Sequence, residues 1–164
     1  MIFLTVGTLF PFDRLVMAVD EAAGKGLIKE EVFAQIGKKS SEPKHIKYAH
    51  VLDKENFDDK VRQASCMISH AGMGSITMAL IHNKPLLVMP RLKRFGEHVN
   101  DHQVGTAKKF EELGHVVVAY REEDLPDKIE SLRTFVPESR ENQALEVTAK
   151  IKQFLDSLQG QEKN

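Results

Sequence analysis

Short apolar runs alternate with longer amphipathic segments along this chain. The runs with the composition of buried strands are Ile2–Val6, Glu31–Gly37, Ile46–Leu52, Cys66–Ser69, Leu86–Met89 and His115–Ala119. Segments with apolar residues at helical spacing separate most of them. Alternation of strand and helix is typical of a parallel sheet with helices packed on its faces. The pattern therefore predicts an α/β domain with a mostly parallel sheet of about six strands.

The amphipathic segments are bounded by residues that start and stop helices. Asp13 is placed to cap a first helix, whose apolar face begins at Leu15 and which Gly24 ends. Further helices are predicted at Asn56–Ala64, after Asn100 or Asp101, at Glu122–Leu132 and at Arg140–Leu158. We expect one domain over residues 1–158 and a polar, frayed tail over 159–164.

The most informative stretch runs from Cys66 to Pro90. A strand is followed by a glycine-containing turn, a helix and a second strand, which is the order of a βαβ unit. The turn consists of His70, Ala71, Gly72, Met73, Gly74 and Ser75.

A turn from a parallel strand into a helix can bind an anion. The first N–H groups of the helix lack internal partners, and the helix dipole favours negative charge near them. Gly72 and Gly74 allow a ligand to approach the backbone, and Ser75 can cap the helix or donate to a phosphate oxygen. From the two glycines alone, an ordinary tight turn is the better interpretation, because such patterns are common.

A second turn of this kind follows the first strand, at Gly7 and Thr8. Ligands of open α/β sheets bind at the carboxyl ends of the strands, so two such turns in one sheet favour a ligand site. In that interpretation the N–H groups of this turn and the Thr8 hydroxyl meet the same phosphates as the central turn. The alternative is a turn with no further role.

The polar segment from Arg91 to His98 lies on the same edge, because it follows a strand directly. Two interpretations stay open for Arg91, Leu92, Lys93, Arg94 and Phe95: a surface that contacts a partner protein, and a solvated basic loop. Two also stay open for His102 and Gln103: contacts to ligand hydroxyls or phosphates, and capping with exposure to solvent.

Two groups of side chains have some features of metal ligands. His98 and His102 are four residues apart, but no third soft ligand is close in sequence. Asp58 and Asp59 are adjacent, and neighbouring side chains on a helix diverge by about 100°, which favours a solvated face. We therefore expect no metal site.

Composition and charge exclude several classes of protein. Of the 164 residues, 41% are hydrophobic and 29% are charged, as in ordinary globular domains. The net charge of −1 gives no basic field for nucleic acid. No apolar run approaches the roughly 20 residues that span a bilayer, and the N-terminus lacks the features of a signal peptide. A single cysteine, Cys66, excludes an internal disulfide and fits a reducing cytosol.

Several motifs together resemble the C-terminal, donor-binding domain of family 28 glycosyltransferases. They are VGTLFPFDRL, SHAGMGSI, NKPLLVMP and PRLKRFGEHVNDHQ, and the resemblance spans about residues 1–120. It extends to single-domain members, namely bacterial exopolysaccharide and capsule glycosyltransferase subunits and the soluble subunit of the two-part eukaryotic N-acetylglucosaminyltransferase. The resemblance implies a Rossmann-like three-layer α/β/α domain that is one half of a GT-B fold.

The resemblance also implies roles for particular residues. Gly7 and Thr8 would face the diphosphate of a UDP-sugar. The pyrophosphate and ribose would be held by the central turn, through His70, Gly72, Met73, Gly74 and Ser75. The sugar hydroxyls would meet Asp101, His102 and Gln103, and the roles of Arg91 and Glu97 are open, although both match the subfamily.

One position departs from the family pattern. Relatives place an acidic residue for the ribose hydroxyls about four residues beyond the turn's second small residue. Here that neighbourhood reads Ile76, Thr77 and Met78, without a carboxylate. Ribose recognition is then left to the backbone, Ser75, Thr77 or a group elsewhere.

The activity implied is an inverting, metal-independent transfer of a sugar from UDP to a hydroxyl of a lipid-linked saccharide. UDP-sugar is a substrate and no cofactor is expected. In the family the general base comes from a separate, membrane-associated acceptor-binding protein, so we expect a cytoplasmic chain that is recruited to the membrane by that partner and is nearly inactive alone. Two other classes stay open: a non-catalytic nucleotide-sugar-sensing subunit, and a metal-dependent hydrolase that uses His98 and His102.

Overall fold

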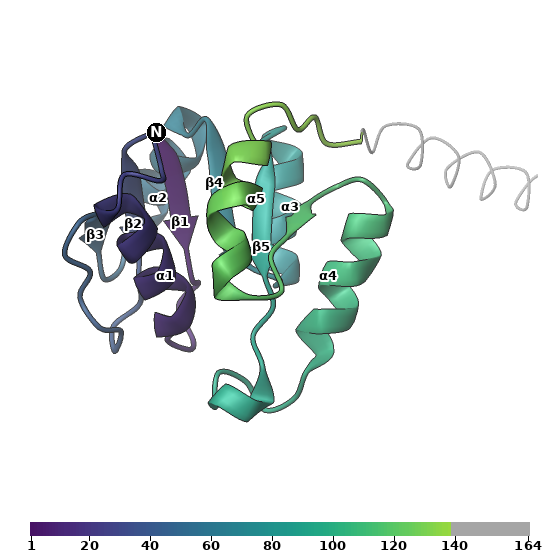
Figure 1. The fold of residues 1–164 in the computed structure, drawn as a ribbon, viewed down its shortest axis with the longest axis horizontal. Coiled ribbons are helices and arrows are strands. Elements are labelled where there is room, and N and C mark those ends of the chain that lie inside the picture. The colour runs from purple at the N-terminus through teal and green to yellow at the C-terminus, as the bar shows by residue number, and fades with distance from the viewer. Residues whose placement is uncertain (139–164) are drawn as a thin grey trace, which may run out of the picture.

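The computed structural model describes residues 1–138 of the chain (Figure 1). In this part six parallel strands form one sheet in the order β3-β2-β1-β4-β5-β6. The strands are β1 Ile2–Thr5, β2 Val32–Gln35, β3 Lys47–Ala49, β4 Cys66–His70, β5 Leu86–Met89 and β6 Val117–Val118. The α-helices are α1 Asp13–Gly24, α2 Lys54–Gln63, α3 Met73–Ile81, α4 His102–Glu112 and α5 Leu125–Ser131. Two short 3₁₀ helices are η1 Lys93–Phe95 and η2 Glu122–Asp124.

Helices cover both faces of the sheet. One hydrophobic cluster joins α1 and α5 to one face, for example through Val16 and Leu125. The other joins α2, α3 and α4 to the opposite face, through Val61, Ile76 and Ala107. Figure 1 shows α1 and α5 on the near side of the strands, with α2 and α3 behind them. The predicted three-layer, Rossmann-like α/β fold is thus confirmed.

The strand order places a crevice at one point of the sheet. Along the chain, β1 is followed by β2 on one side, and β4 then pairs with β1 on the other side. The register puts Thr5 beside both Gln35 and Ser69, so the carboxyl ends of three strands stand level. At such a reversal the loops leave in opposite directions and open a ligand crevice between them.

The edge strand β3 is shorter than the predicted strand Ile46–Leu52. Asp20 of α1 is buried and accepts hydrogen bonds from the backbone nitrogens of Lys44, His45 and Ile46, at 3.0, 2.6 and 3.0 Å. The chain that enters β3 is therefore bonded to a helix side chain in place of a neighbouring strand.

Three predicted helix starts differ from the structure. Asp13 was predicted to cap α1, but the N-cap is Phe12, and the Asp13 carboxylate instead accepts from Ser41 Oγ at 2.7 Å. The helix α2 begins earlier than predicted, because Asp53 caps it by accepting from Asn56 N at 2.8 Å. The N-cap of α3 is Gly72, so Ser75 is not its cap.

The C-terminal elements also have different bounds from those predicted. The predicted helix Glu122–Leu132 is η2 followed by α5, because Pro126 suits the first turn of a helix and cannot continue one from before it. The predicted strand His115–Ala119 contains only the two residues of β6. The predicted helix Arg140–Leu158 and the tail lie outside the described residues.

Candidate functional site

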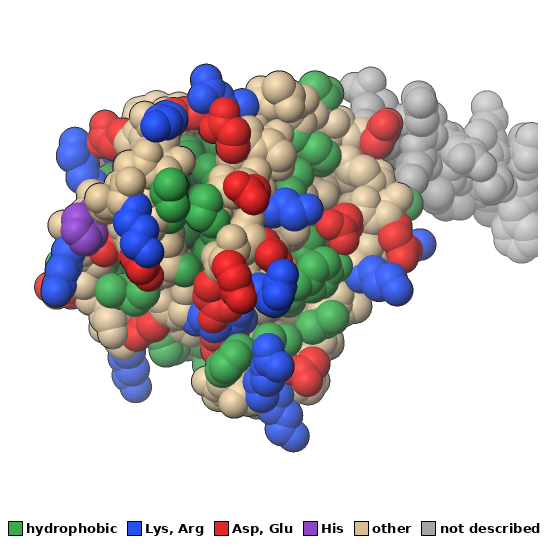
Figure 2. Space-filling model, viewed as in Figure 1, with side chains coloured by type: hydrophobic (Ala, Val, Ile, Leu, Met, Phe, Trp, Pro, Cys, Tyr) green, Lys and Arg blue, Asp and Glu red, His purple; other side chains and the backbone are tan. Residues whose placement is uncertain are grey.

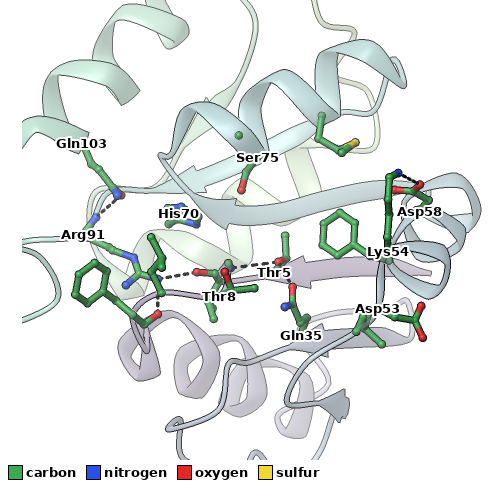
Figure 3. A pocket seen from close by; sticks show the side chains of 18 of the residues that line it. Thr5, Thr8, Gln35, Asp53, Lys54, Asp58, His70, Ser75, Arg91 and Gln103 are labelled. Atoms are coloured by element: carbon green, nitrogen blue, oxygen red, sulfur yellow. Dashed lines mark hydrogen bonds and ion pairs between the residues drawn. The ribbon is translucent and has the colours of Figure 1, made fainter.

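A cavity of about 560 Å³ opens at the carboxyl ends of β1 and β4 (Figure 3). Its walls come from the loop after β1, the end of β2, the starts of α2 and α3, and the segment after β5. A cavity of this size suits a small-molecule ligand such as a nucleotide. Its place at the carboxyl ends of the central strands makes this cavity the strongest site candidate in residues 1–138.

The fold brings together seven of the residues predicted to bind a donor. Those that line the cavity are Gly7, Thr8, His70, Gly74, Ser75, Arg91 and Gln103. Those that do not are Gly72, Met73, Glu97, Asp101 and His102. The residues of the second group stand behind or beside the cavity wall.

A buried serine connects the two turns beside the cavity. Ser69, at the end of β4, donates its hydroxyl to Thr5 O at 2.7 Å. The same oxygen lies 2.9 Å from Ser75 Oγ and 3.2 Å from His70 Nδ1. This contact engages Nδ1 and leaves His70 Nε2 for a ligand.

His70 is held in its neutral form. Burial lowers the pKa of its imidazole to about 4, and the positive charge of Arg91 and the proximity of His98 act in the same direction. At neutral pH His70 is therefore a hydrogen-bonding group without charge.

The glycines around His70 serve different purposes. A Cβ on Gly72 would clash with the imidazole, since it would lie 2.7 Å from His70 Cδ2. Gly7 has φ of +75°, and a Cβ there would lie 3.2 Å from His70 Cε1. A Cβ on Gly74 would meet nothing within 4 Å. Gly7 and Gly72 thus make room for His70, and only Gly74 leaves open space for a ligand, whereas the sequence suggested that role for both glycines of the central turn.

Thr5 and Gln35 line the cavity but were missed in the sequence. Thr5 Oγ1 donates to Gln35 Oε1 at 2.7 Å and accepts from Gly7 N at 3.3 Å. Both are almost fully buried, at 1% and 2% exposure. The sequence did contain an indication of both residues, because each is a polar residue that ends an apolar strand at the ligand edge.

Arg91 ties the loop after β1 to the end of β5. Its guanidinium donates to Val6 O at 2.7 Å, to Phe10 O at 2.8 Å and to Pro11 O at 3.0 Å. Its exposure is 2%, and burial lowers its pKa to about 10, although the nearby Glu97 charge opposes that shift. Its burial therefore excludes Arg91 from both interpretations of the segment, a partner-contact surface and a solvated loop.

Glu97 makes a second tie, from the segment after β5 to the helix α1. Arg14 of α1 donates to Glu97 through Nε at 2.7 Å and through a terminal nitrogen at 2.9 Å. The carboxylate also accepts from Leu92 N at 2.8 Å. Glu97 is buried outside the cavity wall, so its position is that of a support for the loop.

The three predicted sugar-binding residues separate in space. Gln103 is buried at the cavity, where its Oε1 accepts from Arg91 N at 3.2 Å. Asp101 is exposed and accepts from Lys93 N at 2.7 Å. The ring of His102 packs edge-on against His98, with centroids 4.6 Å apart.

The far end of the cavity is largely apolar. Leu52, Phe57 and Met78 line it and pack against the core cluster below α2 and α3. Lys54 and Asp58 lie at its edge, joined by a bond of 2.5 Å from Lys54 Nζ to Asp58 Oδ2 (Figure 3). Asp58 and Asp59 were both predicted to lie on a solvated face. Asp58 instead lines the cavity, whereas Asp59 does not.

Within residues 1–138, no three His, Cys, Asp or Glu side chains gather in a way that could hold a metal ion. In the same range no helix combines the length and apolar character needed to cross a bilayer.

Comparison with known proteins places these features in a family. The model of the glycosyltransferase family 28 C-terminal domain matches residues 1–158. UDP-N-acetylglucosamine transferase subunit ALG13 of Mus musculus is 32% identical over 123 residues, or 70% of this chain and 10% of that protein. The Homo sapiens protein of the same name is 32% identical over 126 residues, with the same shares. The chain thus spans about a tenth of these relatives' length.

Solved structures agree on the fold. An NMR structure of ALG13 has a TM-score of 0.60 at 22% identity and covers 83% of this chain and 87% of that one. MurG of Acinetobacter baumannii has a TM-score of 0.53 at 18% identity and covers 80% and 39%. Os79 of O. sativa in complex with UDP has a TM-score of 0.53 at 16% identity and covers 85% and 36%. The chain belongs to glycosyltransferase family 28 and has the fold of that family's C-terminal domain, a Rossmann-like half of a GT-B enzyme.

Proposed function

We propose that this chain is the donor-binding subunit of a two-part glycosyltransferase. It transfers a hexose or an N-acetylhexosamine from a UDP-sugar to a lipid-linked saccharide that a separate, membrane-associated protein binds. Family membership supports this proposal, and so does the likeness to ALG13, which is named as a subunit of a UDP-N-acetylglucosamine transferase. The setting we propose is exopolysaccharide or capsule synthesis, in the cytoplasm at the inner face of the membrane.

The observation that carries the proposal is that one cavity joins the Gly7–Thr8 turn to the start of α3. In the proposed complex the diphosphate lies between these two turns. The free N–H groups of the first turn of α3 and the hydroxyls of Thr8 and Ser75 then donate to its oxygens. These donors stabilise the charge that develops on UDP as it leaves, so no metal is required.

The two ends of the cavity suit the two ends of a UDP-sugar. The apolar end at Leu52 and Phe57 accepts the base. We place the sugar at the other end, beside Gln103, because the NH₂ group of its side-chain amide can donate to sugar hydroxyls.

Transfer also requires a base for the acceptor hydroxyl. A general base works best with a pKa near the working pH, and the pKa of His70 is about 4. We therefore assign His70 to hydrogen bonding with the donor, and the base to the partner protein. Such a reaction inverts the sugar's configuration, because the acceptor attacks from the side opposite to UDP.

Thermal melting with nucleotides tests donor binding. UDP at a hundred times its dissociation constant is expected to stabilise the chain by about 2.7 kcal/mol, which raises the melting temperature by about 5–10 °C. GDP and ADP should shift it less at equal concentration. The variant Gly74→Val tests whether the shift arises in this cavity. Its side chain fills open space at the cavity wall, so it should abolish the shift while the fold is kept. Equal shifts by all three nucleotides, or none, would refute the proposal.

A transfer assay separates the enzyme from the sensing subunit that the sequence left open. The pure chain is expected to be nearly inactive, and membranes from the source cells should restore transfer. Gln103→Ala should then lower transfer at least tenfold, whereas His102→Ala, outside the cavity wall, should have a smaller effect. Transfer that survives Gln103→Ala in an intact complex would favour the sensing subunit.

A further inference from the structure

One carboxylate on the cavity wall, Asp58, has no role in the donor complex proposed above. Asp58 lies in the second turn of α2, with 22% of its side chain exposed. The other carboxylate of the wall, Asp53, is occupied by the helix start: its two oxygens accept from Asn56 N and from Asn56 Nδ2, both at 2.8 Å. Asp58 bonds instead to Lys54, a flexible and exposed side chain. Of the two, Asp58 is therefore the better acceptor for a ligand.

The wall of the cavity that α3 forms has no carboxylate. Along α3, Ser75 stands at the turn, and Met78 lines the cavity one turn further on. Three residues of helix advance about 4.5 Å along the axis, which in the proposed complex carries the wall from the α-phosphate beside Ser75 to the ribose beside Met78. At that level α3 offers a thioether, which is a weak acceptor for hydroxyl groups.

The helices α2 and α3 lie next to each other. Both pack on the same face of the sheet, and Phe57 and Met78 contact the same core cluster. Phe57 immediately precedes Asp58, and both line the cavity. A ribose beside Met78 is therefore within the part of the cavity that α2 borders.

We propose that Asp58 accepts a hydrogen bond from a ribose hydroxyl of the bound nucleotide, so that α2 supplies the carboxylate that α3 lacks. The inference rests on the proposed function, because it assumes a nucleotide in this cavity. Carboxylates commonly accept from ribose hydroxyls in Rossmann-type domains. The bond from Lys54 lowers the pKa of Asp58 and keeps it ionised.

Calorimetric titration of the whole chain with UDP, 2′-deoxy-UDP and 3′-deoxy-UDP tests the inference. The wild type should bind UDP about tenfold or more tightly than at least one deoxy analogue, because a hydrogen bond to a charged group is lost. Asp58→Ala should bind UDP and that analogue with nearly equal affinity. Asp59→Ala is the matched control, since Asp59 pairs with Arg62 and does not line the cavity, and it should keep the wild-type ratio.

A second variant tests the position of the ribose. Adding Met78→Glu to Asp58→Ala places a carboxylate on the adjacent wall and should restore the preference for UDP. A double variant with the ratio of Asp58→Ala would overturn the placement of the ribose between α2 and α3. Melting curves without nucleotide check that each variant is folded.

The outcomes distinguish this inference from the proposed function. If the wild type does not bind UDP, the proposed function fails. If UDP binds but Asp58→Ala keeps the wild-type ratio of the affinities for UDP and the deoxy analogue, only the role of Asp58 fails. If Asp58→Ala changes the preference for UDP over GDP and leaves the ribose ratio intact, Asp58 contacts the base and the ribose assignment is wrong.

Discussion

At the scale of single residues, the site depends on a histidine that is prevented from ionising. His70 fits between Gly7 and Gly72 and is bonded through Nδ1 to Ser69. A charged imidazole at this position would attract a diphosphate more strongly, but it would also be costly to bury next to Arg91. The structure favours fixed geometry over charge at this position.

This histidine makes stability depend on pH. The ordinary pKa of a histidine side chain is 6.5, and the pKa of His70 in the folded chain is about 4, so the unfolded chain binds the proton more tightly between these values. Stability should therefore be full above about pH 6.5 and fall as the pH drops toward 4, by up to about 1.4 kcal/mol per pH unit.

Urea unfolding of the wild type and of His70→Asn between pH 4 and 7 measures this contribution. The variant should lose less stability on acidification than the wild type. His82→Asn, at the C-terminal end of α3 and outside the cavity, should follow the wild type. Parallel curves for the wild type and His70→Asn would show that His70 does not carry the effect.

At the scale of elements, two ties hold the loops that border the cavity. Arg91 reaches the backbone of the loop after β1, and the Arg14–Glu97 pair joins α1 to the segment after β5. Neither loop has regular structure over most of its length, so these ties replace the backbone hydrogen bonds of a helix or strand. The cavity is thereby shaped before a ligand arrives, which reduces the entropy lost on binding.

We predict that Glu97→Ala destabilises the chain by about 3 kcal/mol, because it leaves the buried Arg14 without its main partner. Urea unfolding measures this loss, and hydrogen exchange at Leu92 N, which Glu97 now protects, should become faster. Glu122→Ala is the control, since Glu122 is 41% exposed and meets Arg14 at 3.6 Å, and it should cost less than about 1 kcal/mol. Similar losses for both variants would contradict the assignment.

At the scale of the whole molecule, the two loops beside the cavity carry exposed apolar side chains. Leu9 and Phe10, which line the cavity, are 86% and 44% exposed, and Phe95 and Val99 in the segment after β5 are 51% and 70% exposed. Lys93 and Arg94 are exposed beside them. In Figure 2, hydrophobic and basic side chains meet on the lower projection that η1 forms in Figure 1. Apolar residues gathered at a site entrance are typical of interaction surfaces.

The proposed acceptor-binding partner should dock on this surface. Arg94→Glu combined with Val99→Ser is expected to lower transfer in the presence of source-cell membranes at least tenfold. The first substitution reverses a positive charge on this surface, and the second replaces an exposed apolar side chain by a polar one. UDP binding by the pure chain should stay unchanged. Ile81→Ser, which is 69% exposed at the end of α3, is the control and should keep full transfer. Loss of UDP binding in the double variant would indicate damage to the cavity instead.

The sequence predicted features that depend on local interactions more accurately than features that depend on contacts between distant segments. The strands of the unit β4-α3-β5 were predicted to within one residue, because apolar runs and glycines define them locally, whereas α3 begins at Met73, inside the predicted turn His70–Ser75. Gly7, His70 and Gly74 were placed at one site because parallel strands end at a common edge. The predicted lengths of β3 and β6 were wrong, and before β3 the backbone nitrogen of Ile46 bonds to Asp20 of α1.

The sequence by itself determined the α/β fold, the ligand edge and the turns that carry the candidate anion site, because those follow from local periodicity and from where glycines stand. Only the tertiary structure decided which polar residues face the cavity. Arg91 and Glu97 stand in a polar segment and their roles were left open, and they are buried because partners more than 80 residues away along the chain satisfy them. Asp58 looked solvated, and it lines the cavity because α2 packs beside α3. Burial and pairing of charged groups depend on contacts between distant segments, which no local pattern records.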